Sequence, residues 1–185
     1  MKKNNKKELF IVEGQSAAST LRQAIKKSDQ TILAVQGKLI NVTTATSEKI
    51  HANQECQKIF QSLACGTAKK CNPDQLPYSR ILILTDPDID GLHSRALVLT
   101  LFDQYLKPLL DSRLIAVILP PLFRITWKET EEKCYAWDEQ ERYQLIGEKA
   151  NEFYVTRFKG IAQFTKEECE KFLLEPQTRK QINLE

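Results

Sequence analysis

Short apolar runs alternate with segments of helical periodicity along the first two thirds of the chain. Four of these runs are almost wholly apolar, as expected for strands buried on both faces of a sheet. The strands are predicted at Leu9–Val12, Thr31–Val35, Ile81–Thr85 and Leu114–Leu119. Apolar residues at three- and four-residue spacing predict helices at Ser16–Lys27, Asn53–Leu63 and Leu92–Leu106. The order of these elements predicts an α/β fold of the Rossmann type, a parallel sheet with helices on both faces.

Pro120-Pro121 ends this alternation, and the elements predicted beyond it are shorter. Two strands joined by a charged turn form a hairpin, and a helix, a strand and a helix follow. These elements are predicted at Leu122–Trp127, Lys133–Trp137, Asp138–Gly147, Glu152–Thr156 and Lys166–Leu174. The sequence therefore predicts three parts: a basic tail at 1–7, a main domain at 8–120 and a small C-terminal α+β appendage at 121–185.

The composition is that of an ordinary folded protein, with 42% hydrophobic and 28% charged residues among 185. The net charge of +3 comes from the four lysines of residues 1–7, so charge alone does not indicate a nucleic-acid partner. No apolar run is long enough to span a bilayer, and we expect no membrane association. Met1 and the lysine-rich start suggest an autonomous small protein rather than an excised piece. The five cysteines include no CxxC pair, which favours reduced thiols in the cytoplasm over a zinc site.

Four carboxylates follow two of the predicted strands. Glu13-Gly14 comes directly after the first strand, and the segment Asp86-Pro87-Asp88-Ile89-Asp90-Gly91 follows the third. In a parallel sheet the strand ends meet at one edge, where ligands bind. Two such charges ~4 Å apart repel by roughly 4 kcal/mol at an effective dielectric near 20. The carboxylates must therefore share protons or surround a divalent cation, and oxygen ligands favour Mg²⁺, Mn²⁺ or Ca²⁺ over zinc.

The acidic segment has two other interpretations. The spacing of Asp86, Asp88, Asp90 and Gly91 matches the start of an EF-hand loop, but the twelfth position is Leu97 rather than a bidentate glutamate. A strand rather than a helix also precedes it. A solvated acidic turn would not explain why Glu13 follows a strand in the same way. A metal centre is the interpretation that accounts for both segments.

The residues around these carboxylates resemble a known family. The pair Glu13-Gly14 and Asp86-x-Asp88-x-Asp90-Gly91 is similar to the Toprim domain of topoisomerases, primases and some nucleases. Further segments resemble the B subunits of the bacterial type IIA topoisomerases, gyrase and topoisomerase IV. These segments are 8–17 (ELFIVEGQSA), 37–42 (GKLINV), 85–95 (TDPDIDGLHSR), 120–123 (PPLF), 157–160 (RFKG) and 176–179 (PQTR). Six ordered segments from residue 8 onward make the resemblance specific.

The resemblance implies half of a DNA cleavage and religation centre. In that family the Toprim carboxylates hold Mg²⁺ at a DNA phosphodiester, and a tyrosine of the partner A-type subunit attacks the phosphate. Carried onto this chain, Glu13 is both a metal ligand and the proposed general acid or base, and Asp86, Asp88 and Asp90 are metal ligands. Mn²⁺ is a possible substitute for Mg²⁺. The implied setting is the nucleoid in the cytoplasm, as part of an ATP-hydrolysing enzyme rather than as an enzyme acting alone.

The resemblance also assigns DNA contacts to Lys38, His93 and Arg95. Arg95 has a second interpretation, in which it pairs with the acidic cluster and holds its shape. Two positions depart from the family: Gln15 stands where an aspartate is usual, and Gln36 stands where a lysine or arginine is usual. We expect these two amides to face each other in place of an ion pair. A gate-binding topoisomerase poison would then be expected to act differently on this protein.

Three functions remain open from the sequence. The first is the metal-binding half of a type IIA cleavage centre that works with an A-type subunit. The second is a non-catalytic Toprim module that binds a topoisomerase or DNA as a regulator, and the third is a standalone Toprim nuclease. Because all four carboxylates are present, metal binding does not separate these functions.

Overall fold

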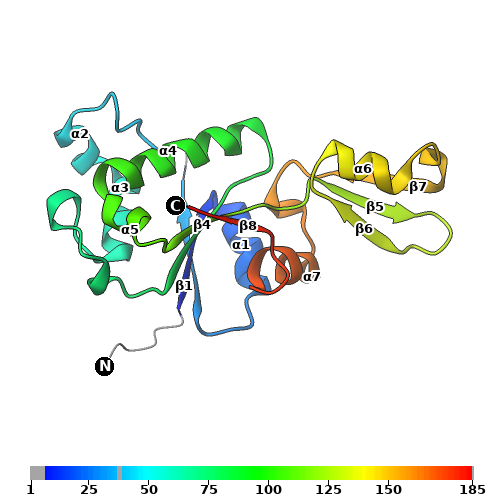
Figure 1. Ribbon diagram of the computed structural model, residues 1–185, viewed down its shortest axis with the longest axis horizontal. Coiled ribbons are helices and arrows are strands. Elements are labelled where there is room, and N and C mark those ends of the chain that lie inside the picture. The colour runs from blue at the N-terminus through cyan, green and yellow to red at the C-terminus, as the bar shows by residue number, and fades with distance from the viewer. Residues whose placement is uncertain (1–6, 37–38, 185) are drawn as a thin grey trace.

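A five-stranded sheet, ordered β2-β1-β3-β4-β8, forms the centre of the molecule (Figure 1). The computed structural model describes residues 7–36 and 39–184. The first four strands are parallel, and the last runs antiparallel to β4. The strands are β1 Glu8–Glu13, β2 Gln30–Val35, β3 Arg80–Leu84, β4 Ile115–Ile118 and β8 Gln181–Asn183. The predicted α/β class with a mostly parallel sheet is confirmed.

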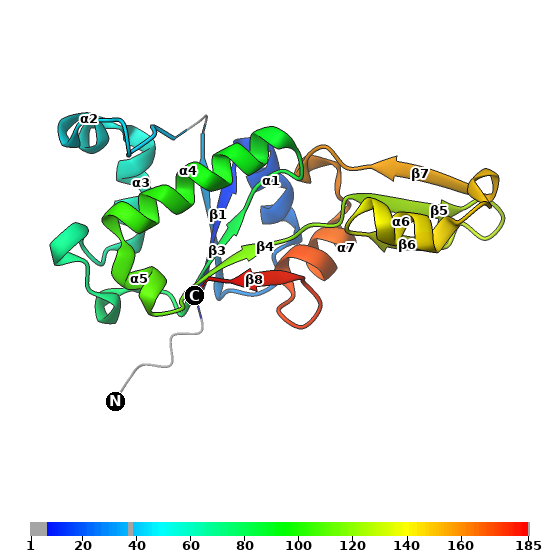
Figure 2. The ribbon, with the colours of Figure 1, turned by 45° about the horizontal axis from the view of Figure 1, so that its top comes forward.

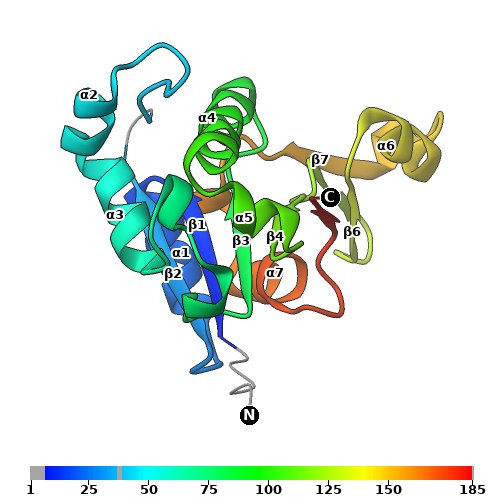
Figure 3. The same cartoon turned by 60° about the vertical axis from the view of Figure 1, so that its left-hand side comes forward.

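Helices cover both faces of this sheet, and successive residues of β1 pack alternately into the two cores that these helices form. Leu9 and Ile11 pack in one core with α3 (Gln54–Leu63), α4 (Ile89–Tyr105) and α5 (Lys107–Asp111). Phe10 and Val12 pack in the other core with α1 (Gln15–Ala24) and α7 (Lys166–Cys169). Figure 3 shows α4 and α7 on opposite sides of the strands. A strand buried on both faces explains why its sequence is continuously apolar.

A smaller antiparallel sheet, ordered β6-β5-β7, extends from one side of the main sheet (Figure 2). Its strands are β5 Phe123–Trp127, β6 Lys133–Ala136 and β7 Phe153–Arg157, and α6 (Glu139–Ile146) packs on it. Phe123, Ile125, Ala136, Ile146 and Phe153 form its own small core. These elements agree with the predicted hairpin, helix and strand to within two residues at each end.

The C-terminal segment then returns to the main sheet. Phe158 and Phe164 are stacked with ring centroids 4.0 Å apart, and both belong to the core that contains α1. Helix α7 continues as a π-helical turn at Glu170–Leu174, and β8 pairs with β4. The predicted boundary at residue 120 stays a prediction, and the structure adds that residues 158–184 pack on the larger sheet.

The sequence did not predict the helices α2 (Ser47–Ala52) and α5 or the strand β8. It also did not predict the short 3-10 helices at Ala68–Lys70, Pro73–Gln75, Ala150–Glu152 and Ile161–Gln163. Helix α4 also begins at Ile89, three residues before its predicted start, because the Asp88 side chain caps it. Within the described residues, no helix is both long enough and apolar enough to cross a membrane.

Candidate functional site

Glu13 and Asp86 leave the sheet at the same edge. Strands β1 and β3 are neighbours and parallel, with Val12 paired to Leu84, so the residues that follow these two emerge together. Gly14 has a φ of +80°, a conformation that glycine adopts without strain, and it directs the chain into α1. The register therefore produces the meeting of the two acidic segments that the sequence predicted.

The Glu13 carboxylate is only half satisfied by its neighbours. Its Oε1 accepts a hydrogen bond of 2.6 Å from the Ser94 hydroxyl of α4. Its Oε2 is buried and has no hydrogen-bond partner within residues 7–36 and 39–184. Burial raises the pKa of Glu13, and the charges of Asp86, Asp88 and Asp90 raise it further, while the Ser94 bond opposes them. A buried carboxylate oxygen without a donor is costly unless a proton or a cation satisfies it.

The Asp86 carboxylate is held by the C-terminal segment. Its Oδ1 accepts a hydrogen bond of 2.8 Å from the Ile161 backbone N–H. Gly160 lies against the same group, since a Cβ there would stand 3.3 Å from Asp86 Oδ2. Burial raises the pKa of Asp86, and the charge of Asp88 adds to this rise, although the Ile161 bond opposes it. A segment 75 residues away along the chain therefore fixes the orientation of this carboxylate.

Asp88 and Asp90 lie at the start of α4. Asp88 is the N-cap, and its Oδ1 accepts a hydrogen bond of 2.7 Å from the Gly91 N–H. Gly91 itself stands against the Asp86 carbonyl, where any Cβ would clash with the backbone. Asp90 follows in the first turn of the helix, and both aspartates are exposed. The helix dipole favours negative charge at this end.

The donor set fits a divalent metal that is bound partly by substrate. Within the described ranges, no three His, Cys, Asp or Glu side chains are arranged closely enough to hold a metal by themselves. Mg²⁺ commonly uses one or two protein carboxylates and completes its shell with water and phosphate oxygens. Glu13 and Asp86 supply such a pair, and the unpartnered Glu13 Oε2 is the observation that favours a cation. Asp88 and Asp90 stay predicted ligands.

The predicted DNA contacts have different surroundings. Lys38 lies outside the described residues. His93 is exposed on α4. Arg95 is half-buried, its guanidinium donates to the Thr85 hydroxyl at 3.4 Å, and burial lowers its pKa. Arg95 forms no ion pair within residues 7–36 and 39–184. The predicted pairing of Arg95 with the acidic cluster is therefore absent among these residues.

The two glutamines that depart from the family flank the same edge of the sheet. Gln15 begins α1 and Gln36 follows β2, and both side chains are exposed. In the described part of the chain no hydrogen bond joins them, so the expected amide pair is not formed. The backbone N–H of Gln36 instead donates to Glu55 Oε2 at 2.8 Å. Glu55, which is also bonded to Lys58 at 2.6 Å, thus holds the backbone at the end of β2 with a side chain only 14% exposed.

A groove of about 360 Å³ lies between the acidic loop and the end of β7. The loop residues Pro87–Asp90 form one wall, and Arg157, Phe158 and Lys159 form the other. A second groove of about 330 Å³ also borders Pro87 and is lined by Arg95, Leu122 and Trp137. Pro87 of the acidic loop thus borders two openings, and basic side chains line both.

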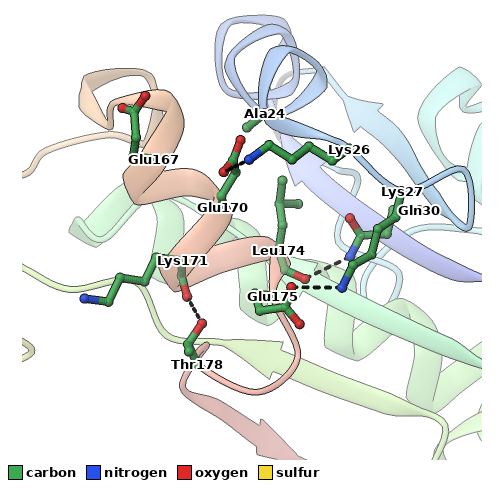
Figure 4. Close-up of a pocket in the computed structure, with 10 residues that line it drawn as sticks. All are labelled: Ala24, Lys26, Lys27, Gln30, Glu167, Glu170, Lys171, Leu174, Glu175 and Thr178. Carbon is green, nitrogen blue, oxygen red and sulfur yellow. Dashed lines mark hydrogen bonds and ion pairs between the residues drawn. The ribbon is translucent and has the colours of Figure 1, made fainter.

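A larger cavity of about 440 Å³ lies elsewhere, between the end of α1 and the C-terminal segment (Figure 4). Its charged side chains largely neutralise one another: Lys26 bonds Glu170 at 2.5 Å, and Lys27 bonds Glu175 at 2.9 Å. Size alone does not make this cavity a site, because its visible chemistry is that of paired surface charges.

Sequence reasoning missed three residues that shape the candidate site: Ser94, Glu55 and Ile161. Ser94 carries a weak signal, since it is a polar residue on the otherwise apolar buried face of α4. No local sequence pattern shows that Glu55 of α3 reaches the backbone of Gln36. Ile161 acts through its backbone N–H, a group common to almost all residue types, so the identity of the residue gives no signal in the sequence.

Comparison with known proteins agrees with this geometry. The Toprim domain matches residues 8–117. The B subunit of DNA gyrase from Thermotoga maritima is 35% identical over 183 residues, and the B subunit of DNA topoisomerase 4 from Enterococcus faecalis is 32% identical over 182. The corresponding topoisomerase 4 protein of Rickettsia conorii is 36% identical over 176 residues. These alignments cover 97%, 97% and 93% of this chain but only 28%, 26% and 26% of the relatives.

Proposed function

Because this chain belongs to the Toprim family and is related to the B subunits of type IIA DNA topoisomerases, we propose that it supplies the metal-binding half of a DNA cleavage and religation centre. Its partners would be duplex DNA and an A-type subunit that carries the nucleophilic tyrosine. Its metal would be Mg²⁺, with Mn²⁺ as a substitute, and it would work at the nucleoid in the cytoplasm. The observation that carries the proposal is the buried, unpartnered Oε2 of Glu13 beside Asp86.

The chain's own residues divide the work at this edge. A bound divalent metal would offset negative charge on the phosphodiester. Glu13, oriented by Ser94, would hold or release a proton at Oε2 near the leaving 3′ oxygen. Its raised pKa brings it closer to the pH at which a proton is exchanged efficiently. Asp86, fixed by Ile161, would present its second oxygen to the metal.

The decisive experiment mixes the protein with the A-type subunit of its host, supercoiled DNA and Mg²⁺ or Mn²⁺. We expect DNA covalently joined to the tyrosine of the A-type subunit, detected after denaturation and protease digestion. The Asp86→Asn variant, which keeps the hydrogen bond from Ile161, should yield no adduct. Adducts at an undiminished level with this variant would refute the assignment of the metal site.

The same experiment separates the two other functions. Cleavage by this protein without an A-type subunit would favour a nuclease with a water nucleophile. Tight binding to the A-type subunit with no adduct would favour a non-catalytic module. Mn²⁺ binding, followed by the paramagnetic signal of the free ion, tests the metal site independently of any cleavage and should be lost in Glu13→Gln.

A further inference from the structure

The edge of the main sheet that carries Glu13, Asp86, Asp88 and Asp90, called the acidic edge below, presents an electrostatic difficulty for a protein that binds DNA. Four carboxylates stand at this edge, and a DNA strand brings one negative charge for each nucleotide. Of the positive side chains nearby, Arg95 is half-buried and directed to Thr85. His93, exposed on α4, lines neither of the two grooves beside the acidic loop. Approach of a phosphate backbone therefore requires other cations near the acidic loop.

Arg157 and Lys159 stand in this position. Both line the groove of about 360 Å³, opposite Asp88 and Asp90. Figure 2 shows the end of β7 and the segment after it beside the first turn of α4. A groove of this volume is within the range of pockets that hold small ligands, roughly 300–1,000 Å³.

The two cations are exposed, but the backbone that carries them is fixed. Arg157 pairs with Phe123 at the end of β7, and its guanidinium lies 5.8 Å from the centre of that ring. Between the two cations, Phe158 is buried in the core and stacks on Phe164. The Lys159 backbone N–H donates to Gln163 at 2.6 Å. Both side chains therefore project from an anchored segment rather than from a free loop.

Neither cation forms a salt bridge with another described residue. Asp88 lines the same groove, yet its Oδ1 is engaged by the Gly91 N–H. A purely structural role for Arg157 and Lys159 would be expected to pair one of them with Asp88 across the groove. Cations left open beside acids are the arrangement that a ligand carrying both phosphate and metal requires.

We propose that Arg157 and Lys159 form a phosphate-binding clamp for duplex DNA in the groove between β7 and the acidic loop. This proposal rests on the proposed function and adds a residue-level account of how DNA reaches the acidic edge. The apolar surface of Ile89, which is 85% exposed on the opposite wall, gives the sugar edge of the strand a contact without charge. The same segment holds Asp86 through Ile161, so a strand bound by the clamp lies next to the predicted metal ligands.

The test measures the salt dependence of binding to a labelled DNA duplex by fluorescence anisotropy, with the full chain, without metal and without an A-type subunit. Each lost phosphate contact should lower the slope of log K against log salt by about 0.9. Arg157→Gln/Lys159→Gln should therefore reduce the slope by about 1.8 and weaken binding at low salt. Arg157→Lys should keep the slope, because it keeps the charge.

The matched control is Lys133→Gln/Lys149→Gln, which removes the same charge from the same small sheet and its loop. Lys133 pairs near the far end of β5, opposite Thr126, away from the acidic loop. This control should keep the native slope, and all variants should keep the native melting temperature. An equal loss of slope in the control, an unchanged slope in the clamp variant, or no DNA binding by the native chain would overturn the clamp.

These outcomes are independent of the cleavage assay. Covalent adducts with an unchanged slope would refute the clamp and leave the proposed function intact. A reduced slope without adducts would support the clamp and favour a non-catalytic DNA-binding module.

Discussion

A buried carboxylate, Glu168, joins the small sheet to the C-terminal segment, and its removal gives a strong test of the fold. Glu168 is 4% exposed. Its two oxygens accept hydrogen bonds from the Arg124 guanidinium, the Tyr135 hydroxyl and the Thr165 backbone N–H. Arg124 comes from β5, Tyr135 from β6 and Thr165 from the cap of α7, so one side chain connects three elements.

Glu168→Ala leaves Arg124 and Tyr135 without their shared partner. Removing one member of a buried ion pair costs about 3–5 kcal/mol, because the other charge stays desolvated. For a chain of this length, 1 kcal/mol corresponds to about 2–4 °C, so we expect the melting temperature to fall by roughly 6–20 °C. Arg124 keeps some solvent access, with 18% of its side chain exposed, which favours the lower half of this range.

Thermal unfolding followed by circular dichroism measures this effect. Glu167→Ala is the control, because it removes a neighbouring exposed carboxylate and should leave the melting temperature close to native. The double variant Arg124→Met/Glu168→Leu should recover most of the loss, since apolar residues can replace a buried pair. If Glu168→Ala lowers the melting temperature no more than Glu167→Ala does, the hydrogen bonds of Glu168 do not stabilise the junction between the small sheet and the C-terminal segment.

The pH dependence of the same variant follows from its pKa. Burial raises the pKa of Glu168, but the Arg124, Thr165 and Tyr135 hydrogen bonds outweigh it and hold the pKa below its ordinary value. A carboxylate whose folded pKa is depressed stabilises the fold above its unfolded pKa of about 4.3. This contribution is lost as the pH falls through the folded pKa. The difference between native protein and Glu168→Ala should therefore be largest near pH 7 and shrink below pH ~4.

Three further variants test the main sheet and the site. Arg179→Met should lower the free energy of unfolding by about 3 kcal/mol in a denaturant titration, because Arg179 is buried and bonds Glu8 at 2.6 Å. Glu13→Gln should raise the melting temperature at pH 7 without metal, because burial raises the folded pKa of Glu13 and makes its ionised form unfavourable above that pKa. The difference from the native protein should vanish at acid pH, where the carboxyl is protonated. An equal rise at acid pH would contradict this cause. Gly160→Val should displace the Asp86 carboxylate and weaken Mn²⁺ binding about tenfold, and an unchanged Mn²⁺ titration would show that Gly160 has no part in positioning it.

The sequence predicted most of the fold because its strands are continuously apolar and its helices are periodic. Such patterns report burial directly, and burial defines the main sheet. The missed strand β8 has no such pattern: Gln181–Asn183 forms a strand because β4 offers it a free edge. Helix α5 has only five residues and contains Pro108, so periodicity cannot identify it. These elements depend on tertiary contacts rather than on local preference.

The sequence also predicted which acidic residues meet at the candidate site, but it did not predict the groups that orient them. Glu13 and Asp86 follow adjacent parallel strands, so their meeting depends only on the order of strands in the sheet. The partners that orient them come from distant segments, Ser94 at a separation of 81 residues and Ile161 at 75. Neither contact has a signature in local sequence, because one uses a common hydroxyl and the other a backbone N–H.

The C-terminal segment explains how the protein tolerates its acidic edge. Burial and mutual repulsion raise the pKa values of Glu13 and Asp86, so at neutral pH both carboxylates act against folding. The same segment that donates to Asp86 also covers one face of the sheet and carries Glu168 and Arg179, whose buried ion pairs fasten it in place. The segment therefore stabilises the fold where the acidic edge weakens it and orients one of the carboxylates. Residues 158–184 are thus part of the architecture of the site, although the Toprim domain match ends at residue 117.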